Sequence, residues 1–207
     1  MRRLNQDERR AALLRAAREL ALEQGVAMPS LDAVIARAGG SRRSIYTEFG
    51  GKAGLRAALI GEISADILVA LPNPAHVKNE NEPHDLRATL KRFAHALLTT
   101  LTSAHGADSS RIIIQDSLIS PERAAVFFAN GPGEGEKRLT TLLEAARARG
   151  EIAIPDCRIA ARCFIGMVRS NLYLERMLQL RPPPDEGEIG THVETAVEIF
   201  MSGIERR

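Results

Sequence analysis

Residues 38–49, AGGSRRSIYTEF, constrain the fold more than any other part of the chain, because they predict a tight turn between two helices. The two glycines can end one helix, and Ser41 can cap the start of the next. The Arg-Arg-Ser that follows would occupy the first turn of the second helix, where side chains can reach base edges in a major groove. Ile45 and Phe49 are four residues apart and share the opposite face, which would pack on the preceding helices.

Helical patterns flank this turn on both sides. Asn5 begins a first helix with an acidic residue three positions later, Ser30 can cap a second, and a long fourth helix with apolar residues every three or four positions follows Lys52. Ala, Leu, Arg and Glu dominate, and no convincing strand pattern occurs. We therefore predict an all-α fold.

The remaining chain predicts a series of further helices. Residues 71–84 are polar and interrupted by prolines, as expected of a connection. Helices are expected over residues 85–103, 108–119, 120–130, 139–149, 156–180 and 189–204. Within them, the run Ile112–Ile114 is expected to be buried, and 156–180 is expected to be one long helix.

Charge is divided unevenly along the chain. Residues 1–60 contain 11 Lys and Arg and 6 Asp and Glu, a net charge of +5, so the remainder carries −3 of the total of +2. A basic front segment suits a polyanionic partner. A solvated face of surface arginines would explain the same distribution, and charge alone leaves both interpretations open.

No pattern of a catalytic or metal site is found in the sequence. It contains no HExxH motif and no phosphate-binding glycine loop, and the five histidines show no i, i+4 pairing. Cys157 and Cys163 lie too far apart on one helix to bridge each other, which suggests a reducing compartment. No run of about 18 apolar residues occurs. We expect a cytoplasmic, non-enzymatic protein without cofactor, metal or membrane contact.

The N-terminal residues resemble the TetR family of transcriptional regulators. The resemblance is carried by Leu14, Ala16, Ala17, Leu20, Gly25, Ala38, Gly39, Ser41, Ile45, Tyr46, Phe49, Lys52 and Leu55. It implies an all-helical homodimer with a three-helix helix-turn-helix DNA-binding domain, here residues 1–51. It also implies a larger helical domain, residues 52–207, that binds an effector and dimerises.

By this resemblance, Tyr46 and Lys52 would contact phosphate, and Arg42, Arg43 and Ser44 would face bases. The complete set of expected DNA-binding residues is Ser30, Ser41, Arg42, Arg43, Ser44, Tyr46, Thr47 and Lys52. The sequence departs from the family pattern at Gly40, usually apolar, at Ile35, usually small, and at Arg43, often glycine. The operator preference of relatives therefore cannot be transferred.

A second, looser resemblance, to the AefR-like and AcrR-like branch of the family, is carried by the order of residues 120–127, Gly131-Pro132, Gly150, Pro155-Asp156 and Ala160-Ala161. Helices that mix large apolar and a few polar side chains suggest an effector pocket, although each such residue could equally belong to an ordinary core. The candidates are Phe93, His95, Leu97, Gln115, Phe127, Phe128, Met167, Asn171 and Tyr173. Cys163 is expected to be an inert buried thiol.

The last two helices have excess apolar surface, which suits a four-helix dimer interface. The candidate interface residues are Phe164, Leu178, Val193, Ala196, Val197, Phe200 and Ile204. The alternative is that the same stripe packs within one subunit.

Together these features predict a dimeric repressor of a near-palindromic double-stranded DNA operator, released by an unidentified small-molecule inducer. The rival interpretation is an all-helical ligand-binding or catalytic bundle whose N-terminal arginines form a solvated or membrane-surface face. The spacing within residues 38–52 favours the regulator, because neither rival role requires it.

Overall fold

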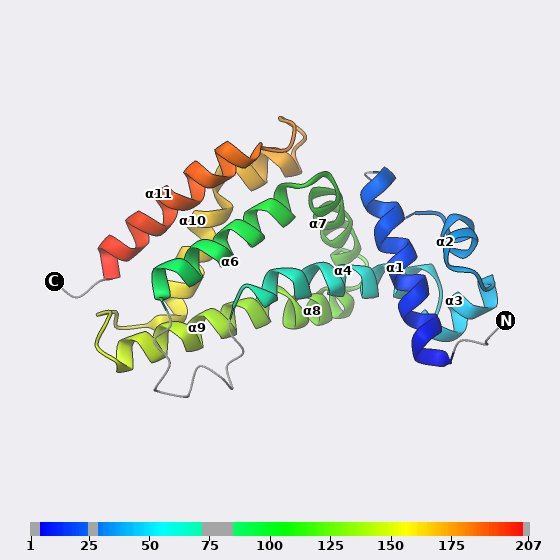
Figure 1. Ribbon diagram of the computed structural model, residues 1–207, viewed down its shortest axis with the longest axis horizontal. Helices are drawn as coiled ribbons and strands as arrows, with labels where there is room; N and C mark the ends of the chain where they lie inside the picture. Colours follow the sequence, from blue (N-terminus) through cyan, green and yellow to red (C-terminus); the bar gives the residue numbers. More distant parts are fainter. Residues whose placement is uncertain (1–4, 25–28, 72–84, 205–207) are drawn as a thin grey trace.

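The computed structural model describes residues 5–24, 29–71 and 85–204, and all the regular elements of these residues are helices (Figure 1). The expected connection at residues 72–84 lies outside the described residues. The N-terminal part contains α1 (Gln6–Gln24), α2 (Leu31–Ala38) and α3 (Arg42–Phe49), followed by α4 (Lys52–Val69). The C-terminal part contains α6 (Leu86–Thr102), α7 (Ala104–Ser117), α8 (Pro121–Asn130), α9 (Pro132–Ala148), α10 (Cys157–Met177) and α11 (Glu186–Ile204).

The N-terminal helices begin at side-chain caps, as their sequences predict. Asn5 and Glu8 form a reciprocal capping box, in which each side chain accepts from the other residue's backbone N–H. Ser30 accepts from the N–H of Ala33, and Ser41 accepts from that of Ser44. Local sequence therefore determines where each of these helices starts.

The turn between α2 and α3 is made by two glycines with positive φ. Gly39 has φ of 76° and donates its N–H to the carbonyl of Ile35, and Gly40 has φ of 105°. Residues with a Cβ rarely adopt these conformations. This geometry explains why both positions of the turn are glycine.

A small apolar core holds the three N-terminal helices together. It also includes the first half of α4, and its buried members are Leu13, Leu14, Ala16, Ala17, Leu20, Ala21, Val34, Ile45, Leu55 and Leu59. Arg37 of α2 donates two hydrogen bonds to Glu23 of α1, at 2.6 and 2.8 Å. The ion pair thus joins α1 to α2, and Ile45 anchors α3 in the shared core.

Helix α4 connects this core to the C-terminal core. Leu55 and Leu59 belong to the first, whereas Ile67 packs against the second. The expected division at residues 51 and 52 stays a prediction. Whatever its position, one continuous helix links the two cores.

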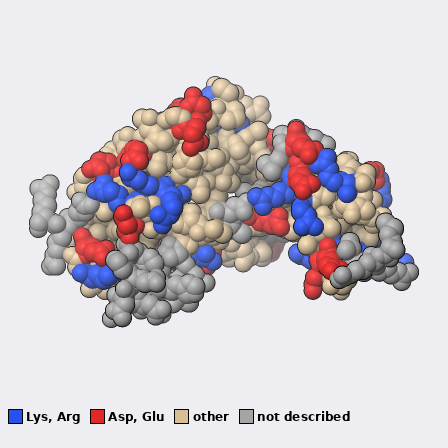
Figure 2. Space-filling view, viewed as in Figure 1, with Lys and Arg blue, Asp and Glu red and all other residues tan. Residues whose placement is uncertain are grey.

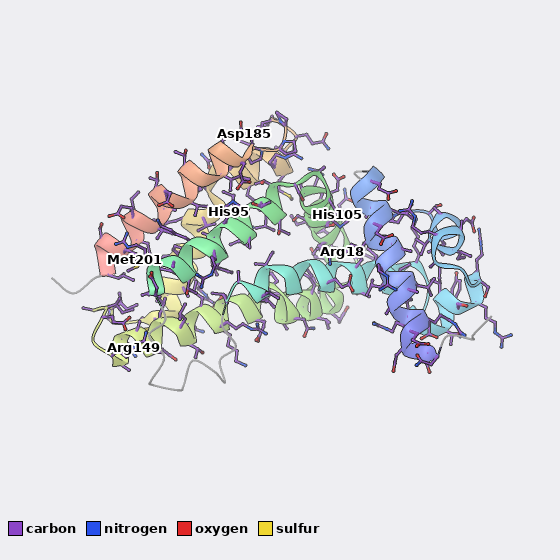
Figure 3. All side chains as sticks on the ribbon, viewed as in Figure 1. Arg18, His95, His105, Arg149, Asp185 and Met201 are labelled. Atoms are coloured by element: carbon purple, nitrogen blue, oxygen red, sulfur yellow. The ribbon has the colours of Figure 1, made fainter. Side chains whose placement is uncertain are left out.

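The C-terminal part is a helical bundle in which α6 contacts α4, α7, α10 and α11 (Figure 1). A line of aromatic rings crosses it: Phe93 of α6 lies 6.5 Å from Phe164 of α10, which lies 4.8 Å from Phe200 of α11. On the surface, α6 and α11 are joined by ion pairs of Arg87 with Glu198 and Lys91 with Glu194. His95, labelled on α6 in Figure 3, forms a hydrogen bond with Glu186 of α11.

Two sequence-based expectations about these helices are corrected by the structure. The expected helix over 156–180 is not continuous, because Ser170 has φ of 42° and ψ of −160° inside α10. Ile114 is 54% exposed, so the expected burial of the isoleucine run does not hold there. The apolar pattern wrongly predicts burial at this position, because the helices that pack on α7 leave Ile114 exposed.

Most of the expected dimer-interface residues are buried in the chain's own core. They are Phe164, Val193, Ala196, Val197, Phe200 and Ile204, and only Leu178, at 59% exposed, is open to a partner. The apolar stripe of α11 packs on α6 and α10, so the intrachain alternative describes these six side chains.

Within the described residues, no helix combines the length and apolar character that crossing a bilayer requires.

Candidate nucleic-acid interface and ligand pocket

Helix α3 presents its first turn to solvent and buries its opposite face. Arg42 and Arg43 are exposed and Ser44 is half-buried, while Ile45 is fully buried against the N-terminal core. Arg10 of α1 lies over the ring of Phe49, with its guanidinium carbon 4.9 Å from the ring centroid. The helix is therefore fixed from behind, and its N-terminal side chains can meet a partner.

Arg42 is held by a residue of the preceding helix. Its Nε and Nη2 donate to the two carboxylate oxygens of Asp32 at 3.0 and 2.7 Å. These hydrogen bonds lower the pKa of Asp32 and raise that of Arg42. Among the described residues no acidic partner is found for Arg43, so its guanidinium is available to a ligand.

Tyr46 and Lys52 lie at the junction of α3 and α4. Tyr46 is 62% exposed, and a Cβ at Gly51 would come within 3.0 Å of its ring, so the glycine allows the ring to lie against this turn. Lys52 is exposed at the first position of α4, whose N-cap Gly51 provides no side-chain cap. Backbone N–H groups at such a helix end favour an anion.

The remaining expected DNA-binding residues are Ser30, Ser41 and Thr47, and two of them are helix caps. Ser30 and Ser41 are exposed, but their hydroxyls cap α2 and α3. Thr47 is exposed on α3. Both caps therefore have a structural role that does not depend on DNA.

Acidic side chains lie among the basic ones on the face shown in Figure 2. Asp32 and Glu23 of the N-terminal part form ion pairs with arginines. The described residues of this part therefore do not form a uniformly basic surface on that face.

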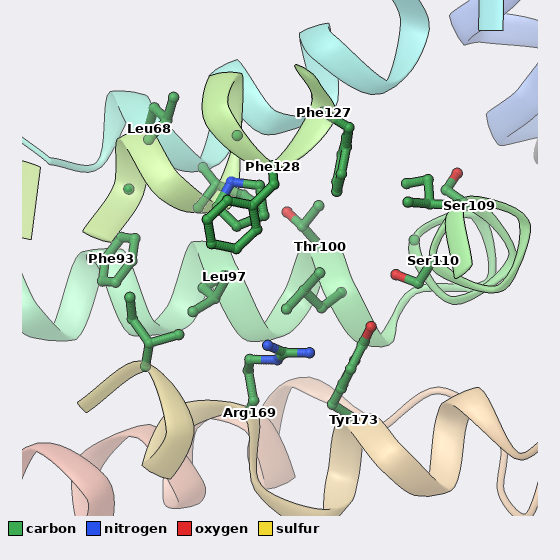
Figure 4. Close-up of a pocket in the computed structure, with 18 of the residues that line it drawn as sticks. Leu68, Phe93, Leu97, Thr100, Ser109, Ser110, Phe127, Phe128, Arg169 and Tyr173 are labelled. Carbon is green, nitrogen blue, oxygen red and sulfur yellow. The ribbon is translucent and has the colours of Figure 1, made fainter. Parts of the chain in front are cut away.

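A cavity of about 310 Å³ lies in the C-terminal part (Figure 4). Its apolar walls include Phe93 and Leu97 of α6 and Phe127 and Phe128 of α8. The other lining residues are Ile67, Leu68, Thr100, Leu101, Gly106, Ser109, Ser110, Ile113, Ile114, Gly131, Pro132, Gly135, Ile165, Arg169 and Tyr173. A mostly apolar cavity with a few polar groups is typical of a small-molecule site.

Five of the expected pocket residues line this cavity: Phe93, Leu97, Phe127, Phe128 and Tyr173. The other four do not. His95 is paired with Glu186 at 2.6 Å, Gln115 and Asn171 are exposed, and Met167 is half-buried beside the core. The prediction is wrong for Gln115 and Asn171, because helical periodicity alone does not show which face of a helix packs on a neighbouring helix.

The sequence did not predict several polar residues of the cavity wall or the contribution of α4. Thr100, Ser110 and Arg169 line it, as do Ile67 and Leu68 from the end of α4. No local motif marks these positions. Cys163, expected to be buried, is exposed, whereas Cys157 is buried.

Comparisons with known proteins agree with this architecture. Residues 13–59 match the family model of bacterial regulatory proteins, tetR family, and residues 88–203 match that of the AefR-like transcriptional repressor, C-terminal domain. None of the curated proteins compared with the chain matches it significantly.

Three solved structures illustrate the similarity. One is described as a TetR-family transcriptional regulator from Mesorhizobium loti, with 18% identity, a TM-score of 0.79 and coverage of 99% of this chain and 100% of the other. The flavonoid-responsive regulator FrrA has 30% identity, a TM-score of 0.65 and coverage of 97% and 99%. The SmeT–triclosan complex has 19% identity, a TM-score of 0.67 and coverage of 96% and 92%.

The match to the C-terminal model covers more than half of the chain, and it follows the match to the helix-turn-helix model in the order that the structure shows. The chain therefore belongs to the TetR family of DNA-binding transcriptional regulators and has an AefR-like C-terminal domain.

Proposed function

We propose that this protein is a dimeric repressor that a small apolar ligand releases from a near-palindromic operator. The observation that carries the proposal is the position of α4. Its first residue, Lys52, follows the reading helix α3 by two glycines, and its last turn supplies Ile67 and Leu68 to the cavity wall. A ligand in the cavity would thus touch the helix that connects to the DNA-binding part.

The release requires two arrangements of α4 with different affinities for ligand. A ligand shifts a conformational equilibrium only by the difference between its affinities for the two states. In a dimer, the two α3 helices would enter successive major grooves about 34 Å apart. A tilt of α4 in each subunit would change that separation and weaken DNA binding.

On the DNA, we assign base contacts to Arg43 and phosphate contacts to Tyr46 and Lys52. Arg43 is exposed without an acidic partner among the described residues, as base reading requires. Lys52 lies at the uncapped start of α4, where an anion is favoured, and the ring of Tyr46 on α3 lies beside its N-cap Gly51. We expect Ser44 and Thr47 of the same helix α3 to add further contacts to the DNA.

The dimer would form through the outer sides of α10 and α11. We define the α10–α11 face by its exposed residues Ile159, Cys163, Gly166, Thr191, Thr195 and Ile199. The two helices are held in register by His192, whose Nε2 lies 3.1 Å from the carbonyl oxygens of Met167 and Val168. The hydroxyls of the two threonines donate to carbonyls of their own helix, which leaves the face poor in free donors.

Gly166 supports this choice of face. A Cβ at this position would meet nothing within 4 Å, so packing inside the chain does not require the glycine. A glycine inside a helix costs about 1 kcal/mol relative to alanine. Close approach of a second subunit would explain why the position is glycine.

The 30% identical FrrA responds to a flavonoid, which is an aromatic compound. Phe127 and Phe128 of the present cavity offer ring faces to such a ligand. We therefore expect the inducer to contain at least one aromatic ring.

Titration of the purified protein with DNA, in the presence and absence of aromatic compounds, tests the proposal. Ligands that release the operator should lose their effect in Leu97→Trp, which fills the cavity. Release that persists in Leu97→Trp would show that the ligand acts elsewhere.

A further inference from the structure

Positive charge dominates the polar part of the cavity. Of the described residues that line it, Arg169 alone carries a formal charge, and none is Asp or Glu. The other polar lining side chains are neutral hydroxyls, among them Thr100, Ser110 and Tyr173. A bound cation would therefore find no counter-charge on these walls, whereas an anion would.

The guanidinium of Arg169 has no ion pair with a carboxylate among the described residues. It lies over the ring of Tyr173, with its carbon 4.4 Å from the ring centroid, and this contact leaves its N–H donors open. Neighbouring arginines of α10 are engaged differently. Arg162 pairs with Glu136 at 2.8 Å, and buried Arg176 donates to backbone carbonyls at 2.6 and 2.9 Å.

Figure 4 shows Arg169 and Tyr173 reaching from α10 toward α6, across the cavity from Phe127 and Phe128 of α8. The backbone departs from helical geometry directly after Arg169, where Ser170 has φ of 42°. Positive φ is unfavourable for a non-glycine residue, and such conformations cluster at ligand sites. The break separates Arg169 from Tyr173, yet both side chains line the cavity.

We infer that the natural effector is an aromatic anion, a compound whose ring system occupies the phenylalanine side of the cavity and whose carboxylate or equivalent group pairs with Arg169. This inference rests on the proposed function and specifies the ligand class of the same cavity. Guanidinium groups bind carboxylates through paired, charge-assisted hydrogen bonds. Because Arg169 is exposed, the pairing would sit at the cavity mouth and would weaken with salt.

Three probes with one ring system test the inference: biphenyl-4-carboxylate, biphenyl-4-methanol and biphenyl-4-methylamine. Their dissociation constants are measured by calorimetry on the full chain at low salt. We expect the carboxylate to bind at least about tenfold more tightly than the alcohol, as a charge-assisted hydrogen bond implies, and the amine to bind most weakly.

Arg169→Gln should bring the carboxylate to within about twofold of the alcohol, because the neutral amide offers both ligands the same kind of hydrogen bond. Arg158→Gln, also exposed on α10 but outside the cavity lining, is the matched control and should keep the wild-type ratio. Leu97→Trp should reduce binding of all three probes, and thermal unfolding of each variant reports whether it is folded.

Equal affinity for the carboxylate and the alcohol, or an unchanged ratio in Arg169→Gln, would overturn the inference. If in that case the alcohol still releases DNA and Leu97→Trp blocks the release, the proposed ligand response stands without the anion. Failure of all three probes to bind the wild-type chain would also overturn the inference. Binding of the same protein to DNA, measured in parallel, tests the proposed regulatory function separately.

Discussion

Arg42 of α3 donates to both carboxylate oxygens of Asp32 on the preceding helix, at 3.0 and 2.7 Å. Its neighbour Arg43 has no acidic partner among the described residues. Two adjacent arginines in the first turn of α3 are therefore inequivalent before DNA arrives. One is oriented by the protein itself, and the other is free to be oriented by a base.

Arg43→Ala should change base preference, whereas Arg42→Ala should change it less. A bidentate arginine–guanine contact contributes about 1–3 kcal/mol of discrimination. Competition binding against an operator library, with each base position varied, measures the preference of each variant. Equal weakening on every sequence by Arg43→Ala would contradict its base-reading role.

Asp32→Asn tests whether the ion pair of Asp32 with Arg42 affects DNA binding. It removes the carboxylate that holds Arg42 and should give this arginine access to bases or phosphates. We expect the variant to bind non-specific DNA more tightly and to show a lower ratio of operator affinity to non-specific affinity. Unchanged binding to both DNAs would mean that Asp32 does not restrain Arg42 in the complex.

Lys52→Ala should weaken binding to specific and random DNA alike, because a phosphate contact carries no sequence information. The slope of log K against log salt should fall by about 1. Tyr46→Phe removes one neutral donor, so it should weaken both complexes without changing the slope. Binding isotherms at several salt concentrations separate the two effects, and a loss confined to the specific operator would contradict both assignments.

Phe164→Ala should lower the free energy of unfolding by about 3–5 kcal/mol, the usual cost of truncating a buried aromatic residue. The ring is fully buried and contacts Phe93 and Phe200. Denaturant unfolding at fixed protein concentration measures this loss. A variant of unchanged stability that no longer dimerises would instead place Phe164 at a subunit interface.

Ile199→Glu should dissociate the proposed dimer, because it places a charge on the α10–α11 face. Val126→Glu on α8 is the matched control, since the two native side chains are 60% and 61% exposed. Sedimentation equilibrium measures the mass of each variant. Dissociation by the Val126 variant alone would move the interface to α8.

In Cys163→Ser, the remaining Cys157 should react with thiol reagents only when the protein opens. Burial raises the pKa of Cys157, so at a given pH less of it is the reactive thiolate. Its labelling rate should rise with denaturant and should increase about tenfold per pH unit near neutrality, because only the thiolate reacts and its fraction grows tenfold per unit below the pKa. Rapid labelling of the native chain at neutral pH would contradict this environment.

The helix-turn-helix could be predicted from sequence because each of its features is local. Ser41 caps α3, Gly39 ends α2, and Ile45 is buried as its spacing requires. The TetR fold and its AefR-like C-terminal domain are likewise confirmed by the family matches.

What could not be predicted depends on which helices become neighbours. The stripe of α11 was compatible with a partner subunit or with α6 and α10, and its periodicity is the same in both cases. The break at Ser170 has no glycine or proline to mark it. Arg169 could be placed at the cavity only after this break and the position of α7 were known.

Binding of the purified protein to its own upstream intergenic DNA is the direct test of sequence-specific, ligand-controlled repression. Anisotropy titrations would compare this DNA with a shuffled sequence of equal composition at two salt concentrations. We predict a tight, sequence-dependent complex with two subunits per site, dissociated by an aromatic ligand that requires an open cavity. Equal binding to both DNAs, seen only at low salt and unaffected by any cavity ligand, would contradict the account.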